Sequence, residues 1–167
     1  PLVMRPEPTL LLTRRTAHMS THSGQVAFPG GKVDETDASH EAAALREAQE
    51  EVGLDPHWVH IAGALPTYTT GTAFIVTPVV GLVRPGFDLT PNPQEVADVF
   101  EVPLAFLMDP DNHQRRVYRW DDGAERSFFA MPWARDDGRE HFIWGVTAAI
   151  IANLSRRIAW EGLTDAA

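Results

Sequence analysis

The most informative part of the sequence is Arg46-Glu47-Ala48-Gln49-Glu50-Glu51-Val52-Gly53-Leu54, which indicates both the expected fold and the expected chemistry. Residues three and four apart share one face of a helix, so Glu47, Glu50 and Glu51 are expected to project together. Three neighbouring carboxylates repel one another, and a hard divalent cation such as Mg²⁺ or Mn²⁺ relieves that repulsion. The spacing therefore predicts that these glutamates bind Mg²⁺ or Mn²⁺ next to a phosphate-bearing substrate.

The surrounding sequence predicts a helix over residues 39–52. Ser39 and Asp37 are suitable N-cap residues, and Gly53 is suited to the left-handed conformation that ends a helix. The interior is rich in helix-forming alanines. Apolar residues group on the side opposite the glutamates and provide a packing face, namely Leu45, Ala48 and Val52. Just upstream, Gly30 and Gly31 form a loop in which the backbone can approach a ligand closely.

This pattern resembles the signature of the Nudix hydrolases, which is Gly, five residues, Glu, seven residues, then Arg-Glu-apolar-x-Glu-Glu-x-Gly-apolar. Gly31 and the whole of Arg46–Leu54 match it. Asp37 stands at the first acidic position, and eight residues separate it from Arg46 instead of seven. The resemblance implies an α/β/α sandwich with a mixed β-sheet between helices, formed as a single domain over residues 1–167.

A second set of residues resembles the coenzyme A pyrophosphatase branch of this family. The set consists of Leu11-Leu12-Thr13, Arg15, His22, Gly24-Gln25 and Phe28-Pro29-Gly30-Gly31. Ser20 stands where the branch often has an arginine. The resemblance implies hydrolysis of coenzyme A or its thioesters to 3′,5′-ADP and 4′-phosphopantetheine. The candidate substrate-binding residues are Arg15, His22, Gln25, Gly30, Gly31 and Lys32.

Three residues are candidates for catalysis. Glu50 is a candidate general base, because clustered carboxylates shift one pKa upward. Glu95 is the second candidate for that role, and the alternative is an ordinary acidic residue at the start of a helix or turn. Arg46 is expected to brace a carboxylate rotamer by paired hydrogen bonds.

Composition narrows the function further. The chain has 167 residues, a net charge of −9 and no cysteine. The absence of cysteine excludes disulfides, thiolate catalysis and cysteine-bound metals. The acidic balance disfavours nucleic-acid binding, which relies on clustered basic residues. No signal peptide or membrane span is evident, so a cytoplasmic location is expected. The oligomeric state stays open.

The remaining elements follow from periodicity. Strands are expected over 9–13, 24–28, 59–67 and 72–83, which are rich in β-branched residues. A hairpin is expected from Arg116–Trp120 and Ser127–Met131 around an Asp-Gly turn. Apolar residues at helical spacing predict a last helix over Phe142–Trp160, with His141 as its anchor.

Alternative functions remain at this stage. The substrate of the enzyme is alternatively ADP-ribose, NADH or a dinucleoside polyphosphate. A non-catalytic Nudix-like nucleotide-binding module is a second alternative, and the retention of Glu47, Glu50 and Glu51 speaks against it. A nucleic-acid processing protein such as a decapping enzyme is the third, and the net charge of −9 speaks against that.

Overall fold

The computed structural model describes residues 1–17, 24–119, 123 and 125–158. They belong to two compact units, Pro1–Leu104 and Ala105–Ala167. The elements of the first unit are β1 (Leu2–Val3), β2 (Thr9–Arg15), β3 (Val26–Ala27), α1 (His40–Val52), η1 (Pro56–Trp58), β4 (Val59–Ala64), β5 (Tyr68–Thr69), β6 (Ile75–Val76), β7 (Val79–Val83) and β8 (Val96–Pro103). Those of the second unit are α2 (Leu104–Met108, beginning at the boundary), η2 (Pro110–Asn112), β9 (Gln114–Arg119), β10 (Glu125–Ala134), β11 (Glu140–Trp144) and α3 (Gly145–Ser155).

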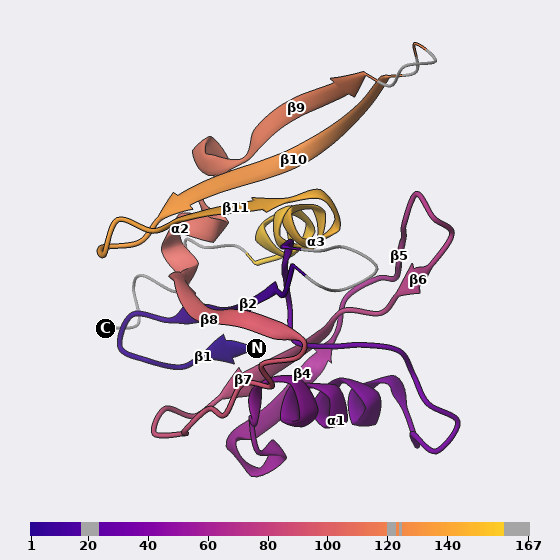
Figure 1. Cartoon of the computed structure of the whole chain (residues 1–167), viewed down its shortest axis with the longest axis vertical. Helices are drawn as coiled ribbons and strands as arrows, with labels where there is room; N and C mark the ends of the chain where they lie inside the picture. Colours follow the sequence, from indigo (N-terminus) through magenta and orange to yellow (C-terminus); the bar gives the residue numbers. More distant parts are fainter. Residues whose placement is uncertain (18–23, 120–122, 124, 159–167) are drawn as a thin grey trace. The chain divides into compact units, whose positions relative to one another are not determined.

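The first unit is built on a six-stranded sheet in the order β3-β2-β1-β7-β4, with β8 paired to β2 (Figure 1). The pairing of β1 with β7 is parallel, and Leu2 lies opposite Leu82. The other pairings in this sheet are antiparallel. The sheet is therefore mixed, as predicted, and the expectation of a mixed α/β fold with helices is confirmed. The prediction of a single domain over residues 1–167 stays a prediction.

Helix α1 begins and ends where its capping residues predict. The Ser39 hydroxyl accepts the N–H of Ala42 at 3.2 Å, which satisfies one of the unpaired donors of the first turn. Gly53 ends the helix at φ 73°, and its N–H returns to the last turn. The packing face contributes Ala48 and Val52 to a buried cluster that also contains Val3, Leu11, Leu54, Val83 and Val96. This cluster fixes the helix against the sheet and so determines which residues it presents on its other faces.

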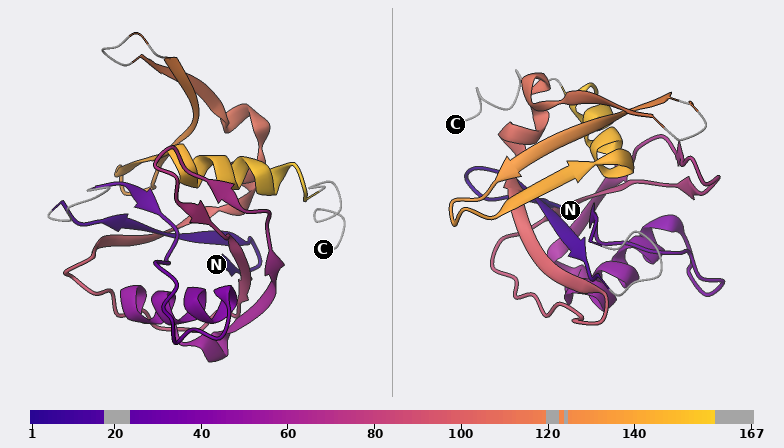
Figure 2. Two further views of the ribbon diagram at one scale, coloured as in Figure 1. Left: turned by 90° about the vertical axis from the view of Figure 1, so that its right-hand side faces the viewer. Right: turned by 45° about the horizontal axis from the view of Figure 1, so that its top comes forward.

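The second unit consists of an antiparallel three-stranded sheet and a helix. Its strand order is β11-β10-β9, and α3 packs against β10 and β11 (Figure 2). The predicted hairpin is present, with Val117 opposite Ser127, while most of the turn between its strands lies outside the described residues. Buried apolar side chains from strand and helix form the core, among them Met131, Ile143, Ile150 and Ile151.

The predicted helix over Phe142–Trp160 is wrong in its first turn. Residues 142–144 continue strand β11, in which burial alternates from residue to residue. His141 is 3 % exposed and stacks on Trp133 at 5.7 Å between ring centroids, so it lies in strand β11, before the helix. Helix α3 begins only at Gly145, which has φ 64°, and ends at Ser155.

Several predicted strands are shorter than expected, and others, among them β1, β5, β8 and β11, were not predicted. The segment 59–67 is a strand only to Ala64, and 72–83 divides into β6 and β7. Strand β8 was not predicted as a strand, although it spans eight residues. None of the helices within the described ranges is long and apolar enough to cross a membrane.

Candidate active site

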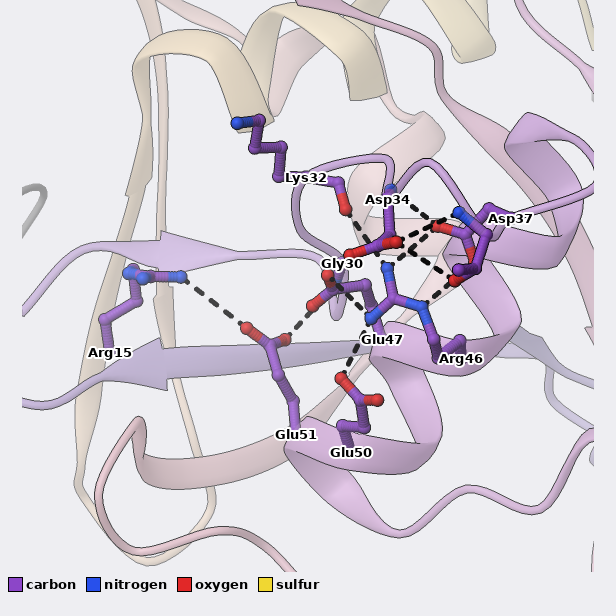
Figure 3. A network of polar contacts seen from close by, with 10 residues as sticks. Arg15, Gly30, Lys32, Asp34, Asp37, Arg46, Glu47, Glu50 and Glu51 are labelled. Atoms are coloured by element: carbon purple, nitrogen blue, oxygen red, sulfur yellow. Dashed lines mark hydrogen bonds and ion pairs between the residues drawn. The ribbon is translucent and has the colours of Figure 1, made fainter.

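The Gly-Gly loop lies directly against the carboxylates of α1. The backbone N–H of Gly30 donates to Oε2 of Glu51 at 3.0 Å (Figure 3). A side chain at position 31 would meet Glu47, because a Cβ atom there would lie 2.2 Å from Glu47 Oε2. Any side chain at position 31 would therefore require the Glu47 carboxylate to move. The hydrogen bond between Gly30 and Glu51 and the close approach of Glu47 to Gly31 hold the loop against the helix.

Glu51 is a buried carboxylate, with 4 % of the residue exposed. Its Oε1 lies 3.6 Å from Nη1 of Arg15, at the end of β2. Burial raises the pKa of Glu51 to about 6, and the negative charges of Glu95 and Glu47 contribute to the rise. The Gly30 N–H and Arg15 oppose it. The environment of Glu51 therefore disfavours the negatively charged form of this carboxyl group.

Arg46 pairs with the other two predicted metal ligands. Its Nη1 lies 2.9 Å from Oε2 of Glu50 and 3.1 Å from Oε1 of Glu47. The Glu50 side chain is 59 % exposed, whereas that of Glu47 is 16 % exposed. Glu47 and Glu50 thus share Arg46 as a partner, whereas Glu51 pairs with the Gly30 N–H and Arg15. That the three glutamates bind a metal ion together stays a prediction.

Asp37 is the strongest partner of Arg46, and sequence reasoning assigned it no such role. Its two carboxylate oxygens accept hydrogen bonds from Nε and Nη2 of Arg46 at 3.0 and 2.9 Å. These bonds are the main reason why the pKa of Asp37 is lowered, and the largest cause of the raised pKa of Arg46. A paired fork of this kind is typical of arginine with a carboxylate. The signal in the sequence was Asp37 at the shifted acidic position.

The loop that carries Glu95 is attached to both β2 and α1. Thr16 donates its backbone N–H to the Glu95 carbonyl and its hydroxyl to the Gln94 carbonyl, each at 3.0 Å. Asn92 donates its backbone N–H to the Glu51 carbonyl at 2.8 Å and its side-chain amide to Glu95 Oε1 at 3.3 Å. The structure thus brings Glu95 close enough to Glu51 for its negative charge to raise the pKa of Glu51. Thr16 and Asn92 were not found from the sequence.

The predicted substrate-binding residues are only partly placed. The Arg15 N–H donates to the Gln25 carbonyl at 3.0 Å, so strand pairing brings these two residues together. Lys32 is exposed, and its carbonyl accepts Nη2 of Arg46 at 3.1 Å. Its ammonium group extends away from Arg46 (Figure 3). His22, like Ser20, lies outside the described residues.

The carboxylates have the chemistry of a site for Mg²⁺ or Mn²⁺, because these ions prefer oxygen ligands. A cation beside Glu51 would offset the repulsion that contributes to its raised pKa. As the side chains stand, no three His, Asp or Glu residues in the part of the chain described are grouped to hold an ion. Glu47 and Glu50 are instead paired with Arg46.

Solved structures share this architecture. A MutT protein from Methanosarcina mazei Go1 is 27 % identical, with a TM-score of 0.51 over 64 % of this chain and 75 % of that one. An Ap4A hydrolase of C. elegans, solved as a binary complex, has a TM-score of 0.52 over 62 % of this chain and 76 % of its own. At 18 % identity, this second likeness shows the fold alone.

Sequence comparisons agree with the fold. The family model of the NUDIX domain matches residues 2–121. A protein of Escherichia coli strain K12 named "Uncharacterized Nudix hydrolase NudL" is 45 % identical over 159 residues, which cover 95 % of this chain and 79 % of that protein. The mixed sheet, the loop and helix around Glu47 and Glu51, and these matches together assign the chain to the Nudix hydrolase family.

Proposed function

We propose that this Nudix hydrolase cleaves the diphosphate bond of coenzyme A, or of its thioesters, and releases 3′,5′-ADP and 4′-phosphopantetheine. Family membership supports pyrophosphatase activity on nucleoside diphosphate derivatives in general. The choice of coenzyme A is supported by a sequence pattern, in which Leu11–Thr13, Arg15, Gly24-Gln25 and Phe28–Gly31 resemble the coenzyme A pyrophosphatase branch.

One observation supports the location of the reaction more than any other. The Gly30 N–H binds Glu51 at 3.0 Å, while Glu47 fills the space over Gly31. A buried acidic group is therefore held beside Gly30, where an added Cβ atom would meet no atom within 4 Å, so the backbone is open to a ligand at that residue. Arg15 lies at the same place, 3.6 Å from Glu51. Carboxylates and a cation together suit a substrate that has two linked phosphoryl groups.

Glu47, Glu50 and Glu51 are the residues proposed to hold Mg²⁺ or Mn²⁺. When bound, such an ion supplies neutralisation of the diphosphate and a lowered pKa for a bound water. Arg15 and Lys32 are proposed to contact substrate oxygens, because a guanidinium or an ammonium stabilises charge that spreads over a phosphoryl group. Arg46 keeps the Gly-Gly loop and the helix together through Lys32 and Asp37.

Glu95 is proposed as the group that accepts the proton of the attacking water, with Glu50 as the alternative. In the reaction, the water oxygen forms a bond to phosphorus, the bridging oxygen leaves with the other phosphoryl group, and the proton passes to the base. Asn92 and Thr16 orient Glu95 for this role. The chain needs no covalent nucleophile for such a displacement.

A substrate panel tests the proposal. The purified protein is incubated with Mg²⁺ or Mn²⁺ and coenzyme A, acetyl-coenzyme A, ADP-ribose, NADH or a dinucleoside polyphosphate, and the products are separated by chromatography. We expect the highest kcat/KM for coenzyme A or its thioester, with 3′,5′-ADP as a product. No turnover of either compound, together with turnover of ADP-ribose or NADH, would refute the substrate and leave the diphosphate chemistry intact.

A matched pair of variants on α1 tests the site. Glu50→Gln removes one negative charge from the proposed metal ligands, and we expect kcat to fall by about 100-fold or more. Glu41→Gln makes the same change in the first turn of the same helix, where Glu41 is part of the capping region, and we expect activity like that of the wild type. Equal activity of the two variants would refute the role of Glu50.

A further inference from the structure

Arg46 pairs with the carboxylates of Asp37, Glu47 and Glu50, and the first and last of these differ in how firmly they are fixed. On one side, Asp37 accepts two hydrogen bonds from its guanidinium, at 3.0 and 2.9 Å. On the other side, Glu50 accepts one, at 2.9 Å. Figure 3 shows Arg46 between these groups, with the Lys32 carbonyl as a further acceptor. Arg46 therefore keeps several partners when any one of them leaves.

The turn before α1 fixes Asp37 independently of the helix. The Asp37 side chain is 5 % exposed, and its Oδ2 also accepts the backbone N–H of Asp34 at 2.7 Å. In return, the Asp37 N–H donates to the Asp34 carbonyl at 3.1 Å. Thr36 closes the same turn, donating its N–H to Asp34 Oδ1 at 3.0 Å. Asp37 is thus a fixed anion in the turn.

Glu50 has the opposite character. Its side chain is 59 % exposed, and its carboxylate forms a hydrogen bond and ion pair with Arg46 at the surface of the helix. An exposed ion pair between residues at i and i+4 of a helix contributes little to stability. Glu50 can therefore leave Arg46 at small cost, provided that Arg46, which is 30 % exposed, retains another anion.

We propose that Asp37 is a positioning residue, a fixed counter-ion that keeps Arg46 paired so that Glu50 can exchange Arg46 for a divalent cation. This inference rests on the proposed function of Glu50 as a metal ligand. Without the Asp37 charge, Arg46 would depend on Glu47 and Glu50, and removal of Glu50 would leave a half-buried cation poorly compensated. Asp37 would thus act on cation affinity through Arg46 and would need no direct contact with the ion.

A double-mutant cycle tests this chain of effects. The dissociation constant for Mn²⁺, without substrate, is measured by calorimetry or by the paramagnetic resonance signal of free Mn²⁺. The proteins are wild type, Asp37→Asn, Arg46→Met and the double variant. We expect Asp37→Asn to weaken binding about 10-fold, the lower end for residues that support metal ligands. In the Arg46→Met background, we expect the same change to alter the dissociation constant by less than about 2-fold.

Two outcomes would overturn the inference. Unchanged Mn²⁺ affinity in Asp37→Asn would show that Arg46 does not compete for Glu50. Equal weakening in both backgrounds would show that Asp37 supports the loop without acting through Arg46. Thermal unfolding in EDTA verifies that each variant folds, and Asp37→Ser, which also removes the charge, carries the same expectation and replaces Asp37→Asn if that variant does not fold.

Controls separate this inference from the proposed function. Asp55→Asn changes another aspartate that accepts a backbone N–H, in this case from His57, and we expect it to leave Mn²⁺ affinity unchanged. Glu50→Gln should weaken Mn²⁺ binding if the proposed function holds. If Glu50→Gln weakens Mn²⁺ binding and Asp37→Asn does not, only the inference about Asp37 is contradicted. If Glu50→Gln leaves Mn²⁺ binding unchanged, the inference and the proposed role of Glu50 are both contradicted.

Discussion

The backbone N–H of Gly30 donates to Oε2 of Glu51 at 3.0 Å, across 21 residues of chain. This bond and Arg15 give Glu51 some compensation for its charge, yet burial prevails and raises its pKa to about 6. In the absence of a cation, the folded protein therefore contains a carboxylate that is less stable when ionised than it would be in the unfolded chain. The ionised form of Glu51 therefore destabilises the metal-free fold, and the cation proposed to bind there would offset this cost.

Glu51→Gln is expected to change how the metal-free protein responds to pH. The folded pKa of Glu51, about 6, exceeds its ordinary value of 4.5, so the folded state binds the proton more tightly. The contribution of Glu51 to the free energy of unfolding is therefore greatest below about pH 4.5. It falls by about 2 kcal/mol in total as the pH rises through 6. Glutamine does not titrate, and it removes this decline. Urea unfolding in EDTA at several pH values measures the effect. Parallel pH profiles of wild type and variant would contradict the assigned pKa.

Gly31→Ala is expected to damage the site much more than the fold. The new Cβ would lie 2.2 Å from the Glu47 carboxylate, and Glu47 is a flexible side chain that can rotate away. We expect a 10- to 100-fold fall in kcat/KM, the range found when groups that support metal ligands are lost, with a small change in melting temperature. In a Glu47→Asp background, which shortens the side chain, the same alanine should cost less. Full additivity of the two changes would argue against this clash.

Arg15→Met is expected to raise KM for the diphosphate substrate by about 10-fold or more, the effect of losing one charge-assisted hydrogen bond. Arg15 lies 3.6 Å from Glu51 and its side chain is 22 % exposed. Its neighbour Arg14 is exposed, so Arg14→Met, which removes the same charge one residue away, serves as the matched control. Steady-state kinetics measures both variants. An equal rise of KM in the two would indicate general loss of positive charge instead of a specific contact.

The sequence predicts α1 well because the determinants of this helix are local. Ser39 and Gly53 cap its ends, and Ala48 and Val52 mark its packing face. The predicted helix over Phe142–Trp160 was wrong at its start because its first residues belong to β11. There the alternation of exposed Phe142 with buried Ile143 has period two, and pairing with β10 makes this the stable conformation. That pairing is a non-local interaction, which periodicity within one segment does not reveal.

The site shows the same division between local and non-local information. Helical spacing correctly predicts that Glu47, Glu50 and Glu51 lie near one another on α1. It is also consistent with the pairing of Arg46 with Glu50, four residues later on the same helix. It does not predict that Asp37, nine residues before Arg46, pairs with the same arginine, because this contact depends on the turn that holds Asp37. Nor does it predict the contact of Asn92 with Glu95, which needs the fold of the whole loop against α1.

Glu95→Gln is expected to lower kcat by about 100-fold or more while KM changes little, as is typical for loss of a general base. The loop residues Thr16 and Asn92 fix the position of Glu95 by hydrogen bonds, so the glutamine side chain should keep its place while losing basicity. Asp88→Asn alters an exposed acid of the preceding loop segment, and we expect it to retain wild-type kcat. The two variants are compared over a range of pH with coenzyme A as substrate. If Glu95→Gln retains full kcat at every pH, the proton must pass to another carboxylate, and Glu50 would then become the base.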